Sequence, residues 1–346
     1  MRGAPGSGRV GEEFAMDVGT ILLWEDRTAD FRSRIAQVES LGYRALGIGD
    51  SPTVYRELMA GLAVASMATS DLALCSMVMV PVGRHPAVVA SALSTLQELS
   101  GDRLSVGIGT GGSGTAGLGQ GPTTLSVLRQ FVDAVRTLLA GQPVEWEGET
   151  VPPPRFPRPV PFYLSAYGPA ARRLAGETFD GVILATGSSV PLIEHFLGEV
   201  GAAAESAGRS AGDVDVWVMS RAAVREDREE ALTDIRANLA SAASFGLRST
   251  AQMATVPEEF RPKVVELQQR YDATQHTLWD GDNARLVEEL GLSEYLAGRF
   301  AVAGTPDECR RQAEGMAAAG VSRLMIPAVD RDPEGLLERF AKAVIR

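Results

Sequence analysis

Cysteine and histidine are scarce in this sequence, and their spacing suits neither a disulfide framework nor a metal site. The 346 residues include two cysteines, Cys75 and Cys309, and three histidines, His85, His195 and His276. Two isolated cysteines cannot build a disulfide framework, and no HExxH or other paired-ligand spacing is present. The sequence therefore predicts no structural metal.

Positive charge and long apolar runs are also in short supply. Lysine and arginine number 33 against 44 acidic residues, a formal net charge of −11, which argues against nucleic acid or an anionic membrane as the main partner. No apolar run approaches the roughly 18 residues that cross a bilayer. The Gly- and Pro-rich start, MRGAPGSGRVGEE, lacks the apolar segment of a signal peptide. We expect a soluble, cytoplasmic protein with a disordered tail over residues 1–13 and a single domain over 14–346.

Short apolar runs alternate with longer helical patterns along the chain. The eight runs are FAMDVGTILLW (14–24), YRALGIGD (43–50), LALCSMVMVP (72–81), RLSVGIGT (103–110), FYLSA (162–166), DGVILAT (180–186), DVDVWVMSRAAV (213–224) and SRLMIPAV (322–329). Uncharged runs are typical of parallel strands covered by helices. The repeated βα unit favours an α/β fold of the (β/α)8 TIM-barrel type over a doubly wound open sheet, with a helical insertion at about 246–300 before the last strand.

In such a barrel the ligand site lies at the carboxyl ends of the strands. Small residues gather there in GTGGSGTAGLG (109–119), SAYGPA (165–170) and ATGSS (185–189). Small residues let backbone N–H groups approach a ligand, and helix N-termini attract anions, so a phosphate near the fifth to seventh strands is expected. Ordinary tight βα turns are the alternative. The glycines do not form a dinucleotide fingerprint, because a long helical pattern follows instead of an acidic residue at the next strand end.

Asp50 closes an otherwise apolar run, and two roles are open to it. Its carboxylate either caps the next helix or accepts hydrogen bonds from a polar ring system. The residues alone do not decide between these roles.

Four stretches carry a resemblance to a known family: LGYRALGIGD (41–50), RHPAVVASALSTLQELSGDRLSVGIGTG (84–111), PFYLSAYGPAARRLAGETFDGVILAT (161–186) and VAGTPDECRRQAEGMAAAGVSRLMIP (302–327). With them, from about residue 16, the chain resembles the bacterial luciferase-like flavin oxidoreductases. It is most similar to the branch that uses the 5-deazaflavin coenzyme F420, such as methylenetetrahydromethanopterin reductase and the deazaflavin-dependent sugar-phosphate and alcohol dehydrogenases. The resemblance implies the same barrel with its insertion, usually as a homodimer.

The resemblance also implies roles for particular residues. Asp50 matches an acid at the polar edge of the deazaflavin, with Ser51 beside it. Ser76 and Met77 match a strand pair joined by a non-prolyl cis peptide that backs the ring. The remaining coenzyme-binding positions are Thr110, Gly111 and Gly112 beside the ring, and Ser165, Ala166, Tyr167, Gly168, Thr186 and Gly187 around the phosphate and side chain.

Two positions depart from the family pattern. Related dehydrogenases have a histidine next to the acid, where this chain has Ser51, and a glutamate after the strand-four glycines, where it has Gly112 and Ser113. These departures weaken the expectation of alcohol-dehydrogenase chemistry, whereas hydride transfer itself belongs to the coenzyme.

The functional expectation is an F420-dependent oxidoreductase acting on a small imine, activated alkene or carbonyl. Glu25 and His276 are the candidate catalytic residues, because both are placed to handle a proton. Trp24, Tyr271 and Trp279 are the candidate substrate contacts. The alternatives are an FMN-dependent monooxygenase fed by a separate reductase and, third, a non-catalytic flavin-binding protein.

Overall fold

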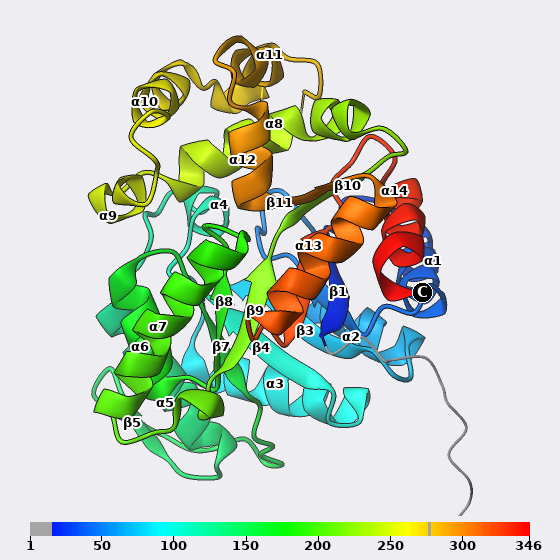
Figure 1. Cartoon of the computed structure of the whole chain (residues 1–346). Helices are drawn as coiled ribbons and strands as arrows, with labels where there is room; N and C mark the ends of the chain where they lie inside the picture. The colour runs from blue at the N-terminus through cyan, green and yellow to red at the C-terminus, as the bar shows by residue number, and fades with distance from the viewer. Residues whose placement is uncertain (1–15, 276–277) are drawn as a thin grey trace, which may run out of the picture.

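Eight parallel strands close into a barrel in the computed structural model, which describes residues 16–275 and 278–346 (Figure 1). Around the barrel the strands follow the order β1-β12-β9-β8-β7-β4-β3-β2. Their bounds are β1 (Asp17–Leu22), β2 (Ala45–Ile48), β3 (Ala73–Met79), β4 (Leu104–Ile108), β7 (Phe162–Ala166), β8 (Gly181–Leu184), β9 (Asp215–Met219) and β12 (Arg323–Pro327). Each strand falls within one of the eight apolar runs, so the predicted TIM barrel is confirmed.

Helices cover the outside of the barrel. They are α1 (Thr28–Ser40), α2 (Leu58–Ala68), α3 (Pro86–Ser100), α5 (Leu125–Leu139), α6 (Pro169–Thr178), α7 (Val190–Ser206), α13 (Pro306–Ala318) and α14 (Pro333–Phe340). Several begin with proline in the first turn, where its missing N–H would have no helical partner. At α13, Thr305 and Glu308 form a reciprocal capping box. A small antiparallel hairpin, β5 (Val144–Trp146) and β6 (Glu149–Val151), follows α5.

A second layer of helices has its own apolar core. It contains α8 (Arg228–Gly246), α9 (Thr250–Ala254), α10 (Arg261–Arg270), α11 (Asp282–Glu289) and α12 (Ser293–Phe300), drawn at the top of Figure 1. The insertion starts earlier than the predicted residue 246. Leu232, Ile235 and Leu239 of α8 are buried against the other insertion helices, so α8 belongs to this layer and not to the ring around the barrel.

The predicted strand over 213–224 is two strands. Ser220 separates β9 from β10 (Arg221–Val224), which leaves the barrel and pairs in parallel with β11 (Ala301–Gly304). The hydroxyl of Ser220 contacts the Ser188 hydroxyl at 3.0 Å and the Phe300 carbonyl at 3.3 Å. This short two-stranded sheet connects the barrel to the insertion at both of the insertion's ends.

The barrel interior is filled at its amino-terminal end. Trp217 is fully buried and stacks on Tyr163 with ring centroids 3.9 Å apart. Asp215 accepts hydrogen bonds from the Tyr163 hydroxyl at 3.0 Å and from the Trp217 indole N–H at 2.8 Å. A side chain on Gly181 would collide with the Tyr163 ring. Because aromatic side chains close this end, a ligand can reach only the opposite end.

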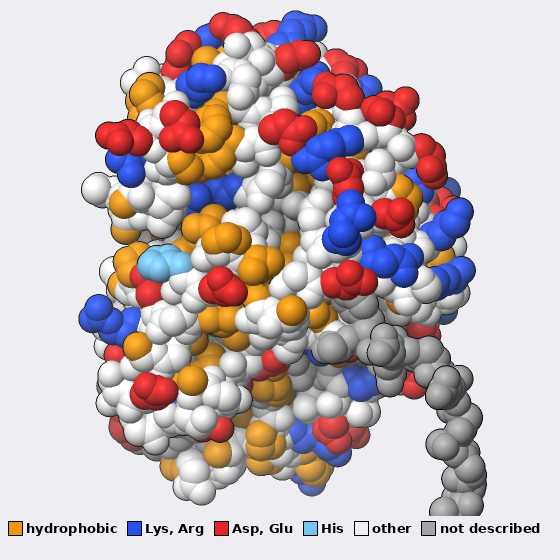
Figure 2. All heavy atoms as spheres, viewed as in Figure 1, with side chains coloured by type: hydrophobic (Ala, Val, Ile, Leu, Met, Phe, Trp, Pro, Cys, Tyr) orange, Lys and Arg blue, Asp and Glu red, His pale blue; other side chains and the backbone are white. Residues whose placement is uncertain are grey.

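Charged side chains of both signs are mixed over the surface. On the face shown in Figure 2, acidic and basic side chains are interspersed over the insertion and the neighbouring helices. Within residues 16–275 and 278–346, no helix combines the length and the apolar character that a membrane span requires.

Candidate active site at the barrel mouth

The insertion lies over the carboxyl ends of the strands, the region we call the barrel mouth. In α9, the amide of Gln252 donates to the carbonyl oxygen of Tyr167, directly after β7, at 3.1 Å. In α8, the amide of Asn238 donates to the carbonyl oxygen of Val329, after β12, at 3.3 Å. The insertion is therefore fastened to the rim of the mouth on two sides.

Strand β3 carries a non-prolyl cis peptide, but not at the predicted bond. The cis bond joins Met77 to Val78, one residue after the expected Ser76–Met77 bond. Ser76 still pairs in register with both neighbouring strands, and its hydroxyl donates to the carbonyl of Gly107 at 2.8 Å. The register shifts only between Ser76 and Met79, because these contacts hold Ser76 in the ladder. Met77 turns into the barrel interior, against Gly47.

Asp50 is buried and already has partners within the chain. Its carboxylate accepts hydrogen bonds from the backbone N–H of Val80 at 3.0 Å and from the Arg84 guanidinium at 2.9 Å. Arg84 also donates to the Val80 carbonyl at 3.0 Å. Asp50 therefore ties the end of β2 to the loop after β3. It does not cap α2, where Glu57 serves as the N-cap.

Several glycines in the loop after β4 allow close packing. A side chain on Gly114 would put Cβ 2.7 Å from the carbonyl oxygen of Asp50, and one on Gly117 would collide with Thr53. The hydroxyl of Ser51 also contacts that of Ser113 at 2.8 Å. These contacts hold the loop against the segment after β2. Gly114 and Gly117 therefore serve packing within the chain and do not offer open main chain to a ligand.

The first residues of that loop keep some open main chain. Thr110 accepts a hydrogen bond from the N–H of Thr123 at 2.8 Å through its carbonyl. Gly111 has a φ of +117° and lies against Thr115, so a side chain there is excluded on two grounds. Gly112 begins the short helix α4 (Ser113–Ala116), and a Cβ on it would meet nothing within 4 Å. Among Thr110, Gly111 and Gly112, it is Gly112 that faces open space.

The end of β7 presents a mixture of core and mouth residues. Ala166 is fully buried in the core between the barrel and its helices, so its side chain has no place in a ligand site. Ser165 is partly buried beside Gly109. Gly168 is the N-cap of α6, with no side-chain cap and nothing within 4 Å of a built Cβ. The first turn of α6 can therefore receive an anion directly on its backbone N–H groups.

Thr186 and Gly187 follow β8. Thr186 is buried, and its hydroxyl oxygen has no hydrogen-bond partner among the residues that the structure describes. Such an orphaned group is costly unless a ligand or water completes it. A Cβ on Gly187 would lie only 2.7 Å from a side-chain carbon of Leu192. Gly187 therefore allows close packing against Leu192.

Two side chains that the sequence analysis did not single out lie at the mouth. The ring of Tyr55 packs over Gly49 at the end of β2. Burial raises the pKa of Tyr55, the nearby charge of Glu25 raises it further, and the charge of Arg221 acts in the opposite direction. Glu25 is exposed. The Tyr55 hydroxyl thus lies within electrostatic range of both Glu25 and Arg221.

Tyr167 completes this group from the β7 side. Its side chain keeps 39% of its surface exposed, yet burial raises its pKa, and Arg221 again acts in the opposite direction. Tyr167 thus combines an accessible side chain with a hydroxyl within electrostatic range of Arg221. A sequence signal for Arg221 did exist, because a charged residue interrupts the apolar run VWVMSRAAV.

The predicted substrate contact Trp24 lies elsewhere. It is 6% exposed, stacks on Phe31 of α1 with centroids 4.6 Å apart, and lies near Gly61 of α2. The structure thus gives Trp24 a packing role between two outer helices. An aromatic residue two positions beyond a strand does not reveal by sequence which way it turns.

Two of the three candidates from the insertion, Tyr271 and Trp279, have separate surroundings. Tyr271 packs edge-on against Phe245, 6.0 Å between ring centroids, within the insertion itself. Trp279 lines a hollow of about 730 Å³ together with neighbouring residues, the start of α11 and Arg331. His276, the candidate acid–base residue, lies outside the described residues.

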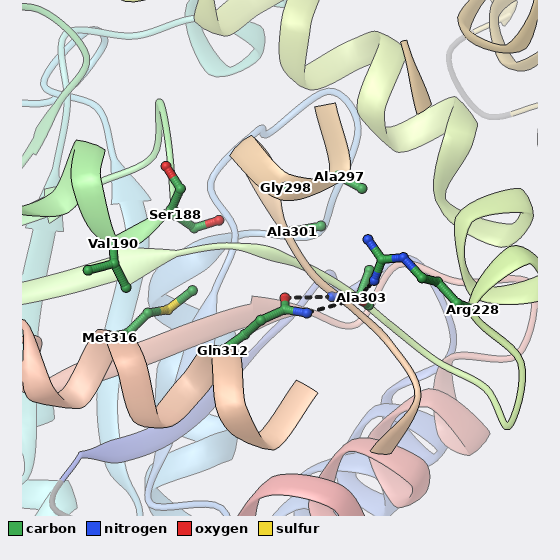
Figure 3. Close-up of a pocket in the computed structure, with 10 residues that line it drawn as sticks. Ser188, Val190, Arg228, Ala297, Gly298, Ala301, Ala303, Gln312 and Met316 are labelled. Atoms are coloured by element: carbon green, nitrogen blue, oxygen red, sulfur yellow. Dashed lines mark hydrogen bonds between the residues drawn. The ribbon is translucent and has the colours of Figure 1, made fainter. Parts of the chain in front are cut away.

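A cavity of about 320 Å³ lies beside the barrel, between α7, α12, α13 and β11. Figure 3 shows the amide of Gln312 directed at the backbone of Ala303, which it bonds at 3.2 and 3.0 Å. Arg228 enters from the opposite side and pairs with Glu294 at 2.6 Å. The two largest polar side chains that line this cavity, Gln312 and Arg228, are therefore already paired, and the cavity is separate from the barrel mouth.

No cluster of three His, Cys, Asp or Glu side chains that could hold a metal ion occurs among the residues that the structure describes. The open main chain at Gly112 and Gly168, the orphaned Thr186 hydroxyl and the tyrosine–arginine group instead suit an organic ligand with anionic parts.

Known proteins share both this sequence pattern and this fold. F420-dependent glucose-6-phosphate dehydrogenase 1 of Rhodococcus jostii is 29% identical over 289 residues, 79% of this chain and 78% of its own length. The 5,10-methylenetetrahydromethanopterin reductase of Methanopyrus kandleri is 26% identical over 355 residues, covering 94% and 97%. The solved F420-dependent tetrahydromethanopterin reductase from M. kandleri superposes with a TM-score of 0.76 at 23% identity, covering 96% and 99%.

A solved FMN complex has the same architecture at greater distance. The oxygenating component of 3,6-diketocamphane monooxygenase from Pseudomonas putida has a TM-score of 0.64 and 16% identity, covering 96% of this chain and 98% of its own. The family model described as luciferase-like monooxygenase matches residues 11–323. The resemblance in the sequence is thereby confirmed: this chain belongs to the luciferase-like monooxygenase family.

Proposed function

We propose that this protein is a coenzyme F420-dependent oxidoreductase that exchanges a hydride with a small organic substrate at the barrel mouth. The observation that carries the proposal is that relatives named as F420-dependent align with 79% of the chain, and a methylenetetrahydromethanopterin reductase with 94%. We further propose that the protein works in the cytoplasm as a homodimer.

The residues of the mouth fit such a coenzyme. Gly112 and Gly168 leave space where any side chain would intrude on a flat ring or its phosphate-bearing tail. The orphaned hydroxyl of Thr186, after β8, offers a polar contact on the far side of Gly168 from Gly112. The uncapped first turn of α6 suits a phosphate. In this arrangement Met77 and Val78 would back the ring.

The chain's own residues would bind and orient the substrate and transfer a proton. A bound deazaflavin supplies hydride transfer, so the protein needs to hold the substrate close and handle a proton. Glu25 is exposed at the end of β1 and acts on the Tyr55 hydroxyl. We assign proton transfer to Glu25, whose charge also raises the pKa of the nearby Tyr55 hydroxyl. Replacement of Glu25 by glutamine is expected to lower kcat by about 10²-fold or more, while coenzyme affinity is retained.

A second candidate is an FMN-dependent monooxygenase supplied by a separate reductase. The FMN-bound structure with the same fold favours it. The two functions differ in coenzyme and in oxygen use: only the monooxygenase would consume oxygen in proportion to reduced FMN. Neither candidate identifies the substrate, which is expected to be an imine, an activated alkene or a carbonyl.

Coenzyme binding separates the candidates. Purified protein is titrated with F420 and with FMN, and binding is followed by coenzyme fluorescence. We expect the F420 dissociation constant to be at least tenfold lower than that for FMN. Gly112→Ala should weaken F420 binding, whereas Gly198→Ala, at an exposed helical glycine that also has free space around it, should leave binding unchanged. Tighter binding of FMN, with oxygen consumption, would replace the first function by the second.

A further inference from the structure

Arg221 stands where the barrel meets the insertion. It is the first residue of β10, directly after the carboxyl end of β9, and pairs in register with Ala301 of β11. Side chains alternate along a strand, so Arg221 shares a face with Ala223. Ala223 is buried in the core of the insertion. Arg221 therefore projects from the rim toward the insertion that covers the mouth.

The guanidinium of Arg221 has no acidic partner. Within the described part of the chain, neither an ion pair nor a side-chain hydrogen bond involves it, and the groups that act on its charge are the hydroxyls of Tyr167 and Tyr55. The next arginines along the chain differ. Arg225 pairs with Asp234 at 2.5 Å, and Arg228 pairs with Glu294 at 2.6 Å. A partly buried cation without a counter-charge is unfavourable unless a ligand supplies one.

The tyrosines approach Arg221 from different sides of the barrel. Tyr55 follows β2, and Tyr167 follows β7. In the closed strand order, β2 lies three places from β9 in one direction (β2-β1-β12-β9) and three from β7 in the other (β2-β3-β4-β7). Groups from three such separated strands can share one electrostatic environment only over the middle of the mouth. Burial lowers the pKa of Arg221 and raises that of both tyrosines, in keeping with a desolvated location.

We propose that Arg221, with the hydroxyls of Tyr55 and Tyr167, forms an oxyanion-binding subsite that selects substrates bearing a carboxylate or phosphate group. The inference rests on the proposed function, because it takes the middle of the mouth as the place of the substrate. A guanidinium offers paired N–H donors to two oxygens of one anion, and each phenol adds an O–H donor. The subsite thus neutralises the charge that the chain leaves unpaired.

The coenzyme would use other groups. The open main chain, the uncapped helix and the orphaned hydroxyl lie after β4, β7 and β8, at Gly112, Gly168 and Thr186. These suit the ring and its phosphate. Arg221 projects from the rim at β9 toward Tyr55, which follows β2, so we assign it to the second ligand of the reaction.

The first experiment measures oxyanion binding without turnover. Inorganic phosphate and malonate are titrated calorimetrically at low ionic strength into wild-type protein, Arg221→Gln, Arg221→Lys and the control Arg228→Gln. We expect Arg221→Gln to weaken binding about tenfold or more, Arg221→Lys to retain most of it, and Arg228→Gln to match wild type. Tyr167→Phe should weaken oxyanion binding less than Arg221→Gln. It tests the subsite if Arg221→Gln does not fold.

The second experiment identifies which ligand the subsite serves. The same variants are titrated with F420 and with its riboside fragment, which lacks the phosphate-bearing tail. We expect Arg221→Gln to bind both as wild type does. A loss of F420 affinity with unchanged fragment affinity would assign Arg221 to the coenzyme tail and overturn the substrate role.

Two further outcomes would also overturn the subsite: wild-type oxyanion binding in Arg221→Gln, or no oxyanion binding by the wild-type protein. Failure of wild-type protein to bind F420 would refute the proposed function instead. The oxyanion titrations are carried out without coenzyme, so they test the subsite whether or not F420 binds.

Discussion

The buried pair of Asp50 and Arg84 supports the barrel mouth, and its removal is the most direct test of the site's construction. The resemblance implies that Asp50 lies at the polar edge of a ring, and the structure shows its carboxylate bonded to Arg84 and to the N–H of Val80. The perturbation is Asp50→Asn, which removes the charge and keeps the shape. If Asp50 acts through these contacts, the loss should be one of stability and should depend on Arg84.

The magnitude follows from burial. The side chain of Asp50 is 2% exposed, and that of Arg84 is 17% exposed. Breaking a fully buried pair costs about 3–5 kcal/mol. Asparagine still accepts one hydrogen bond, Arg84 retains some water, and Glu57 lies 4.0 Å away, so we expect about 2 kcal/mol. With an unfolding entropy of about 2.1 cal/mol/K per residue, this lowers Tm by about 3 °C.

The assay is a double-mutant cycle in urea unfolding. Asp50→Asn, Arg84→Met and the double variant should give a coupling energy of about 2 kcal/mol. Asp30→Asn removes an exposed pair with Arg27, whose side chains are 46% and 85% exposed, and should change stability by less than about 0.5 kcal/mol. A coupling energy near zero, together with a large fall in F420 affinity, would refute the reasoning and return Asp50 to the coenzyme.

Three further predictions concern packing and ionisation. Gly114→Ala should destabilise by about 1–3 kcal/mol in urea unfolding, because its Cβ would lie 2.7 Å from a backbone oxygen, whereas Gly112→Ala should be tolerated. Burial raises the pKa of Tyr43 in the folded state, so the unfolded chain loses its phenolic proton first as pH rises. The stability of wild type relative to Tyr43→Phe should therefore be constant below pH ~10 and fall by about 1.4 kcal/mol per pH unit above it. Burial also raises the pKa of both thiols, Cys75 and Cys309, to about 12, so neither should react with a thiol reagent before unfolding.

The barrel was predictable because its strands are predominantly apolar and recur with helices between them. Such runs suit a parallel sheet that is covered on both faces, and all eight lie where the pattern indicated. The split at Ser220 was not predictable, because β9 and β10 differ in their partners and not in their composition. Likewise, the pattern of α8 does not tell whether its apolar face meets the barrel or the insertion.

The location of the candidate site was predictable from the sequence, but the contacts of its residues were not. Strand ends marked where Asp50, Gly112 and Thr186 would lie, since parallel strands present their carboxyl ends on one side. The contacts of these residues were not predictable. Arg84 reaches Asp50 across 34 positions of the sequence, and Trp24 turns away from the mouth onto α1.

Charge pairing explains why the most informative residue of the mouth was missed. The sequence shows 33 basic residues, and nothing in their spacing tells which ones lack a partner. Arg84 and Arg221 both lie near strand ends, yet Arg84 pairs with a buried carboxylate, whereas Arg221 has no acidic partner among the described residues. Folding neutralises Arg84 and leaves Arg221 to be neutralised by something else. An unpaired charge is a property of the assembled mouth, and that is why it bears on the ligand rather than on the fold.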